Sequence, residues 1–450
     1  MRTVLKNGRV IDPSSGLDEV LDLAMEDHRV VELGKGLAAH TEVDVSGLSV
    51  TPGFIDVHTH EDESYDEAIY PHTQRQMALM GVTTMVAGNC GLGVRDIPRY
   101  LNLMEGKCLV NLAMLVPYNS LRRYLGYKSP YEPTPPGEFA RLRGLMAQGL
   151  KAGAFGFSFG PEYDPGITDD EMVDQCSALR DHPGSMVAVH YRLDGELVLD
   201  SIVAVGRIGA ANGVTCQFSH IGSGAAFGWM SQALDVLEKT RQQGVNILAD
   251  CYPYDAWCTY AGSTCYEEQN LERMGLGHDR LLAVSGKYRG QRMTRETLAD
   301  LREHDPEVRI VGFGLNEHEV LDALRHPLVM VASDGGVRDD TGHPRVTGTF
   351  PKALGRYVRA GMLDFHETLR KMTCGPADHV GLRGKGRITP GSDADICVFD
   401  PDSLEDRATF SEPLLAPAGI HHVLVDGRFA VREGRITEER AGRVLRLAAR

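Results

Sequence analysis

The middle of the chain alternates short apolar runs with longer amphipathic segments. In segments such as residues 138–153 and 229–244 the apolar positions recur three and four residues apart, which predicts helices. The apolar runs between such segments predict strands that are buried on both faces, and strands of this kind joined by helical crossovers form (β/α)8 barrels. We therefore expect an α/β fold of the TIM-barrel type. The eight runs are GFIDVH (53–58), TTMVAG (83–88), LVNLAML (109–115), AFGFSFG (154–160), SMVAVH (185–190), TCQFSH (215–220), VNILADCYPY (245–254) and LVMVASD (328–334).

A ninth apolar run, VRIVGFG (308–314), also has the pattern of a strand. It lies in the long connection before the last predicted barrel strand. Connections of this length inside a domain are usually functional insertions. We expect an insertion or lid within residues 255–327.

The two ends of the chain differ from the middle, because short β-type runs there alternate with turn residues. Asn7-Gly8 and Asp426-Gly427 are dipeptides typical of tight turns between strands. This pattern predicts one small β-sandwich domain built from both termini. We expect it to comprise residues 1–53 plus 376–450, with the barrel spanning residues 54–375.

Metal-binding side chains follow five of the predicted barrel strands. The carboxyl ends of barrel strands converge on one face, so we expect these side chains to share one cavity. Residues two apart on a strand point the same way, so the first two histidines can bind one ion. Imidazole, thiolate and carboxylate suit Zn²⁺, and a thiolate disfavours Mg²⁺ and Ca²⁺. The candidates are His58, His60, Cys90, His190, His220 and Asp334.

Composition and charge narrow the range of partners. The 450 residues are 42% hydrophobic and carry a net charge of −15, which disfavours nucleic acid and anionic membranes. No window is apolar enough for a membrane span, and the N-terminus has no apolar segment of a secretory signal. Nine cysteines without regular spacing indicate reduced thiols, so we expect a cytoplasmic protein. The oligomeric state cannot be deduced from these features.

The predicted metal centre indicates a hydrolase. Zinc lowers the pKa of a bound water to about 7 and polarises carbonyl groups. Asp334 is the expected general base, which takes the proton of the water and passes it to a leaving amine. The chain has no nicotinamide fingerprint and no G-x-S-x-G motif, and its glycine-rich GSGAAFG (222–228) lacks the Lys-Ser/Thr of a phosphate loop.

Seven motifs, in this order along nearly the whole chain, resemble the N-acyl-D-amino acid deacylases (D-aminoacylases) of the amidohydrolase superfamily. Cysteine as the ligand after the second strand and the H-P-R…G-T-F-P…G-R-Y series are the narrower part of the resemblance. The motifs are PGFIDVHTHED (52–62), TTMVAGNCG (83–91), GAFGFSFGPEYDPG (153–166), VHYR (189–192), FSHI (218–221), ADCYPYDA (249–256) and VASDGG (331–336) with GHPRVTGTFPKALGRYVR (342–359).

The resemblance implies a zinc-dependent enzyme that cleaves N-acyl-D-amino acids to a carboxylate and the free D-amino acid. It implies one tightly bound zinc ion on Cys90, His190 and His220. It also implies a second, weaker metal site at His58 and His60 that shares Cys90. Preference for a D substrate rests wholly on the resemblance.

The resemblance also implies residues that bind the small N-acylated amino acid. Asp334 would be the catalytic acid/base and would touch the metal. Arg345 would pair with the α-carboxylate of the substrate, a task suited to the planar guanidinium, and Tyr163 would help to hold it. Tyr252 and Tyr254 end the seventh strand, where they either line the pocket as substrate-binding residues or pack in the core.

Three departures from the family pattern affect the expected specificity. Residues 219–222 are S-H-I-G, where acid-selective members carry a lysine two residues after the histidine, so a neutral side chain is favoured over D-glutamate or D-aspartate. Asp194 stands where the H-x-R-x-E motif has glutamate. The connection before the last strand is short for the family, so we expect a reduced lid.

Two other functions stay open. One is cyclic-amide hydrolysis, as in hydantoinases and dihydroorotases, but these carry a carboxylated lysine where this chain offers Cys90. The other is a non-catalytic scaffold protein on the amidohydrolase fold, which should have lost ligands that this chain retains.

Overall fold

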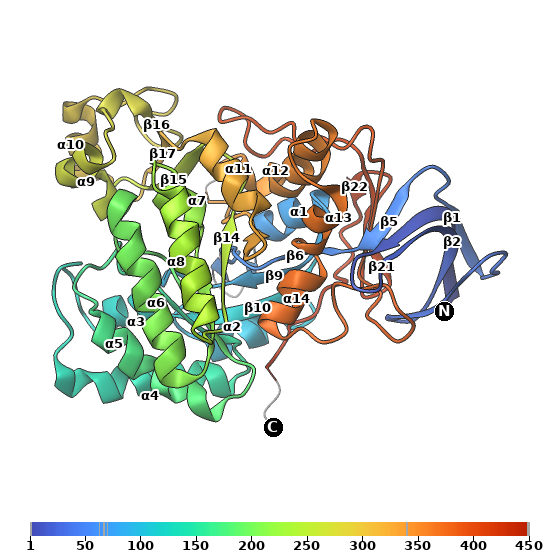
Figure 1. The fold of residues 1–450 in the computed structure, drawn as a ribbon, viewed down its shortest axis with the longest axis horizontal. Helices are drawn as coiled ribbons and strands as arrows, with labels where there is room; N and C mark the ends of the chain where they lie inside the picture. The colour runs from blue at the N-terminus through green and yellow to red at the C-terminus, as the bar shows by residue number, and fades with distance from the viewer. Residues whose placement is uncertain (1, 63, 66–67, 70, 339–340, 448–450) are drawn as a thin grey trace.

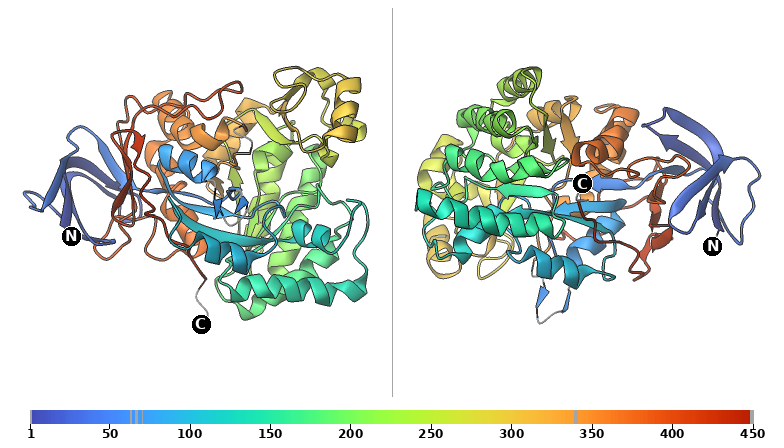
Figure 2. Two further views of the ribbon diagram at one scale, coloured as in Figure 1. Left: turned by 180° about the vertical axis from the view of Figure 1, so that it is seen from behind. Right: turned by 90° about the horizontal axis from the view of Figure 1, so that it is seen from below.

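The computed structural model describes residues 2–62, 64–65, 68–69, 71–338 and 341–447 of the 450-residue chain. A barrel surrounded by helices makes up the larger part of the molecule, and a β-sheet region lies at one side of it (Figure 1). In both views of Figure 2 the N-terminal strands lie beside the C-terminal segments. Among the described residues, no helix is long and apolar enough to cross a bilayer.

Eight parallel strands form the barrel, and each pairs with the next in chain order. The first and last strands meet through a parallel bridge between Thr59 and Gly335, where the His60 N–H donates to the Gly335 carbonyl at 2.8 Å. Each strand overlaps one of the eight predicted runs, so the predicted barrel is confirmed. The strands are β6 (Phe54–Asp56), β9 (Val82–Ala87), β10 (Asn111–Pro117), β11 (Gly156–Phe159), β12 (Met186–Val189), β13 (Thr215–Phe218), β14 (Ile247–Cys251) and β18 (Val329–Val331).

Helices cover the outside of the barrel (Figure 1). The helix predicted at residues 229–244 is α8 (Met230–Gln242), which buries one face and exposes the other. The start of α5 (Asp169–Gln175) is stabilised by a capping box between Thr168 and Glu171. The other helices that accompany the barrel are α1 (His72–Leu79), α2 (Ile97–Met104), α3 (Tyr118–Tyr124), α4 (Phe139–Lys151), α6 (Val198–Asn212), α7 (Ile221–Ala225), α11 (Glu317–Arg325), α12 (Arg345–Pro351), α13 (Phe365–Arg370) and α14 (Cys374–Val380).

The ninth apolar run belongs to an insertion and not to the barrel. It forms β17 (Arg309–Phe313), which pairs antiparallel with two other strands in a separate three-stranded sheet. This sheet and two helices project at one end of the barrel (Figure 1). The remaining elements of the insertion are β15 (Ala256–Tyr260), β16 (Leu281–Ala283), α9 (Glu268–Arg273) and α10 (Arg295–His304).

Strands from both termini form one nine-stranded sheet. The predicted turn at Asp426-Gly427 is present and has two residues with positive φ, 53° and 75°. The N-terminal and C-terminal strands join where β5 pairs with β19. The strands are β1 (Arg2–Asp12), β2 (Leu17–Glu26), β3 (Arg29–Gly34), β4 (Thr41–Asp44), β5 (Ser49–Pro52), β19 (Ile396–Phe399), β20 (Ile420–Val425), β21 (Arg428–Arg432) and β22 (Arg435–Ile436). A two-stranded ribbon outside this sheet pairs β7 (Ser64–Tyr65) with β8 (Ala68–Ile69).

Asn7-Gly8 does not form the predicted turn between strands. It lies inside the continuous strand β1, where the register with β2 shifts between Leu5 and Gly8 and Asn7 has a φ of 61°. A bulge, like a hairpin turn, uses a residue with positive φ, so the dipeptide alone does not distinguish the two.

The limits of the two domains stay a prediction. The helix α14 spans the predicted boundary at residue 376. The C-terminal segment also returns to the barrel, where the Leu445 N–H donates to the Leu112 carbonyl at 2.8 Å.

Candidate functional site

The carboxyl ends of the barrel strands bring all six candidate ligands together. The ligand atoms form two groups, and within each group they lie within 4.8 Å of one another. Cys90 belongs to both groups, so two ions bound there would be neighbours. The groups are His58, His60, Cys90 and Asp334, and Cys90, His190 and His220.

Three of these residues have a backbone conformation that side chains other than glycine rarely adopt. The φ angles are 58° at Cys90, 34° at His220 and 50° at Asp334. Each residue comes just after its strand, where the chain turns sharply. Positive φ costs roughly 1–3 kcal/mol per residue and persists only where the surrounding structure imposes it. Among the described residues between 54 and 375, these three are the non-glycine residues with positive φ, and the other such residues lie near the two ends of the chain.

The Cys90 thiol is in the chemical form that binds metals. Its Sγ lies 3.2 Å from His58 Nε2 and 3.6 Å from His220 Nε2. Burial alone would raise the pKa of Cys90, but the neighbouring His58, His190 and His220 hold this pKa well below its usual range. The thiolate, and not the thiol, is the metal ligand.

Buried carboxylates form hydrogen bonds with the candidate histidine ligands and orient them. Glu162 Oε2 lies 2.7 Å from His190 Nε2, while the buried His190 Nδ1 has no hydrogen-bond partner among the described residues. Asp250 on β14 accepts from His58 Nδ1 at 3.1 Å and from the His220 N–H at 2.9 Å. Contacts of this type hold the rings of ligating histidines in many metalloproteins.

Neither carboxylate was predicted from the sequence to belong to the site. Asp250 could have been identified from the sequence, because it lies inside an apolar strand and a buried acid must have hydrogen-bond or charged partners. Glu162 lies in the loop after β11 and offered no comparable signal.

The donor set fits a transition-metal ion. The group of Cys90, His190 and His220 brings a buried thiolate together with imidazole nitrogens, and one of these, His190 Nδ1, has no hydrogen-bond partner among the described residues. Sulfur and nitrogen donors in this combination suit zinc.

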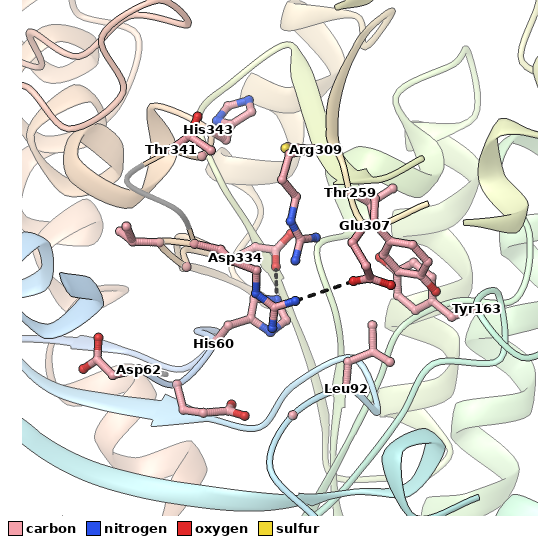
Figure 3. A pocket seen from close by; sticks show the side chains of 18 of the residues that line it. His60, Asp62, Leu92, Tyr163, Thr259, Glu307, Arg309, Asp334, Thr341 and His343 are labelled. Atoms are coloured by element: carbon pink, nitrogen blue, oxygen red, sulfur yellow. Dashed lines mark hydrogen bonds and ion pairs between the residues drawn. The ribbon is translucent and has the colours of Figure 1, made fainter. Parts of the chain in front are cut away.

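Asp334 connects the ligand groups to the substrate side of the site. Its Oδ1 lies 3.1 Å from His60 Nε2 (Figure 3), and its Oδ2 lies 2.8 Å from Arg345 Nη2. Burial would raise the pKa of Asp334, but Arg345 and the two imidazoles of His58 and His60 hold this pKa well below its usual range. The carboxylate is therefore ionised and able to accept a proton.

A cleft of about 400 Å³ opens above Asp334, and a smaller cavity of about 20 Å³ continues it toward His190 and His220. Arg345 and Tyr163 line both spaces, and Arg345 Nη1 is buried without a hydrogen-bond partner among the described residues.

The two tyrosines that follow the seventh barrel strand lie differently. Tyr252 lines the inner cavity, and its ring centroid lies 4.7 Å from the Arg345 guanidinium carbon. Tyr254 lines neither space. It packs against Lys352 instead, with the ammonium nitrogen 4.2 Å from the ring centroid. Of the two places that the sequence left open, Tyr254 takes the one in the core, because the chain turns at Pro253 and directs this ring to α12 and its continuation.

The chain is similar to known proteins in sequence and in structure. Models of the amidohydrolase family match residues 49–215 and 316–431. The chain is 32% identical to a D-aminoacylase from Alcaligenes xylosoxydans xylosoxydans, over 98% of this chain and 97% of the relative. The crystal structure of N-acyl-D-glutamate deacylase from Bordetella bronchiseptica with zinc and a phosphonate inhibitor is similar, with a TM-score of 0.87, 29% identity and 99% of each chain covered. A D-hydantoinase from Thermus sp. shares the fold, with a TM-score of 0.67, 20% identity, and 99% of this chain and 98% of that chain covered.

Proposed function

Because this chain belongs to the D-aminoacylase family of amidohydrolases, we propose that it hydrolyses the amide bond of N-acyl-D-amino acids to a carboxylate and the free D-amino acid. The observation that carries the proposal is a thiolate shared by two ligand groups, Cys90, beside the ion pair of Asp334 and Arg345. The ligand groups can bind a metal ion, and the ion pair offers a base and a binding site for a carboxylate.

The proposed cofactor is zinc. Cys90, His190 and His220 would hold one ion tightly, and His58 and His60 would form a weaker second site that shares Cys90. Zinc supplies Lewis acidity, which acidifies water and polarises the scissile carbonyl.

Asp334 is the proposed general acid/base. It takes a proton from the attacking water while the water oxygen bonds to the amide carbon. It then gives this proton to the amide nitrogen as the C–N bond breaks, and the amine leaves. Proton transfer by one positioned carboxylate would serve both halves of the reaction.

Arg345 is the proposed binding residue for the α-carboxylate of the substrate. Its Nη1 has no partner in the described structure, and Tyr163 and Tyr252 lie next to it in the inner cavity. Its Nη2 pairs with Asp334 in the free chain, so a substrate carboxylate would draw Arg345 away. Asp334 would then lose a positive neighbour and become more basic when substrate is present.

The two alternatives have less support. Cyclic-amide hydrolases of this fold carry a carboxylated lysine between their metals, whereas the residue common to the two ligand groups of this chain is Cys90. A non-catalytic scaffold would have no reason to retain three strained ligands and an unpartnered buried arginine nitrogen.

We also propose a cytoplasmic location. All nine cysteines are free and eight of them are buried, which suits a reducing compartment.

The test is hydrolysis of paired N-acetyl-D- and N-acetyl-L-amino acids by protein of known zinc content. The pairs should cover acidic, neutral, aromatic and basic side chains. Turnover of D substrates alone, lost in Cys90→Ala and Asp334→Asn, is the expected result. Absence of turnover of every pair by zinc-loaded protein would reject the proposal, and cyclic amides would be assayed next.

A further inference from the structure

The charged side chains of the cleft are almost all paired. Glu61 accepts from the Val94 N–H at 2.6 Å, and Asp62 accepts from the Thr73 N–H at 2.6 Å. Each acid therefore has a hydrogen bond within the protein, while the second oxygen of Glu61, Oε2, has no hydrogen-bond partner among the described residues. The remaining pairs are Glu307 with Arg338 at 3.7 Å, Asp334 with Arg345 at 2.8 Å, and Arg123 with Asp164 at 3.2 Å.

Arg309 is the exception among the charged side chains of the described cleft residues. It lines the cleft and is half-buried, yet its guanidinium has no hydrogen bond or ion pair to any described residue. An arginine carries five N–H donors in a planar fork that matches a carboxylate. Its unsatisfied donors therefore face the space that a substrate would occupy.

The backbone of Arg309 is held by a sheet and not by a loose loop. Arg309 begins β17 and lies directly opposite Tyr260 of β15 in the antiparallel register. Residues directly opposite each other in a sheet project from the same face, and both side chains line the cleft. Figure 3 shows Arg309 near Thr259 of the same strand pair, on the wall that the insertion contributes.

A second arginine of the cleft, Arg123, contacts the strand pair that carries Arg309. Tyr260, its cross-strand neighbour, accepts a hydrogen bond from Arg123 Nη2 at 3.2 Å. Asp164, the acid that pairs with Arg123, also lies 3.7 Å from Arg122 Nη1. The Asp164 carboxylate is thus shared by the two guanidiniums of Arg122 and Arg123. None of the paired acids of the cleft lies within ion-pair distance of Arg309.

We propose that Arg309 binds the side-chain carboxylate of the substrate, so that the preferred substrates are N-acyl derivatives of acidic D-amino acids. This inference rests on the proposed deacylase function, in which Arg345 holds the α-carboxylate deeper in the site. Two guanidiniums at different depths of one cleft match a substrate with two carboxylates.

This assignment differs from the expectation drawn from the sequence. The sequence favoured a substrate with a neutral side chain, because the lysine that acid-selective family members carry two residues after the histidine is missing after His220. That argument considered a single position of the chain. In the structure the positive charge comes from another element, β17 of the insertion, so the loss of the lysine does not leave the cleft without a cation.

The experiment compares kcat/KM for N-acetyl-D-glutamate and its neutral counterpart N-acetyl-D-glutamine, which have nearly the same shape. N-acetyl-D-aspartate and N-acetyl-D-leucine complete the panel. Native protein should prefer glutamate over glutamine at least tenfold. Arg309→Met should lower kcat/KM for the acidic substrates about 10- to 100-fold, the usual effect of losing a charge-assisted hydrogen bond. Activity on the neutral substrates should stay within about twofold, which also reports correct folding.

Two further variants sharpen the test. Arg309→Lys keeps the charge and should restore part of the preference for acidic substrates. Arg338→Met, the matched control, removes another arginine of the same cleft that already pairs with an acid, and it should leave the glutamate-to-glutamine ratio unchanged.

The outcomes separate this inference from the proposed function. No turnover of any D substrate by native protein would reject the deacylase function itself. Turnover of neutral D substrates in preference to acidic ones would reject only the role of Arg309. An equal loss on all substrates in Arg309→Met would also overturn it, because the residue would then act on a group common to all of them.

Discussion

Replacing Glu162 by glutamine should weaken metal binding at the group of Cys90, His190 and His220. Glu162 Oε2 lies 2.7 Å from His190 Nε2, and both side chains are at most 4% exposed. The other ring nitrogen, His190 Nδ1, has no hydrogen-bond partner in the described structure and is therefore the one available to an ion. A carboxylate on the far side of a ligating imidazole fixes the ring and raises its basicity.

The magnitude follows from what the substitution removes. Loss of such a partner typically lowers metal affinity about 10- to 100-fold, which is about 1.4–2.8 kcal/mol. Glutamine keeps the volume and an acceptor oxygen, so Glu162→Gln should lower the zinc affinity about tenfold. Glu162→Ala leaves the imidazole N–H without an acceptor, so it should lower the zinc affinity about 100-fold.

The assay is competition for zinc against a chromophoric chelator at pH 8. Burial raises the pKa of Glu162 to about 7, so the carboxylate is ionised at pH 8 and its full effect is measured there. At pH 6 the native side chain is protonated, and the difference from Glu162→Gln should shrink. Glu171→Gln is the matched control, since it changes a buried glutamate of α5 that lies outside both ligand groups. If Glu162→Gln bound zinc at pH 8 as tightly as the native protein does, the reasoning would be refuted.

Three further predictions concern substrate binding, pH and stability. Arg345→Met should lower kcat/KM for N-acyl-D-amino acids about 10- to 100-fold, but have little effect on analogues with an amide in place of the α-carboxylate. Steady-state kinetics on both series measures this, and an equal loss on both would exclude direct contact with that carboxylate. Burial would lower the pKa of His60, but neighbouring anions raise it to about 9, so protons compete with metal until the pH rises through this value. Calorimetric titration should show that the affinity for a second zinc ion rises with pH between pH 7 and 9. The affinity for the first ion should change much less, because burial lowers the pKa of His220. Parallel pH dependence of the two affinities would contradict this prediction. Phe54→Ala should cost about 3–5 kcal/mol in urea unfolding, since the ring is fully buried and stacks on Phe350 with centroids 5.5 Å apart, and a change below about 1 kcal/mol would be incompatible with a packed core there.

The barrel strands could be located from the sequence because each is buried on both faces. Continuous apolar runs with helical segments between them leave few other arrangements. The same reasoning could not separate the ninth run, residues 308–314, from the eight barrel strands. Its residues are as apolar, and only its antiparallel partner β15 shows that it belongs to the insertion. The pairing partner of a strand is not encoded in its own periodicity.

In the candidate site, too, some residues could be predicted from the sequence and others could not. His58, Cys90 and Asp334 could be proposed because strand ends of a barrel converge whatever lies between them in the chain. Glu162 and Asp250 were missed because their importance depends on which imidazole each one contacts. These contacts join residues 28 and 192 positions apart.

By itself, the sequence determined which segments form strands and helices and which kinds of side chain stand at the strand ends. Both follow from local periodicity and from the chemistry of single residues. Only the tertiary structure decided that Asp250 contacts both His58 and His220, that Arg345 pairs with Asp334, and that the Arg309 guanidinium lines the cleft without a partner among the described residues. Distances between side chains remote in the chain are set by the closure of the barrel and the packing of the insertion, and neither has a local signature.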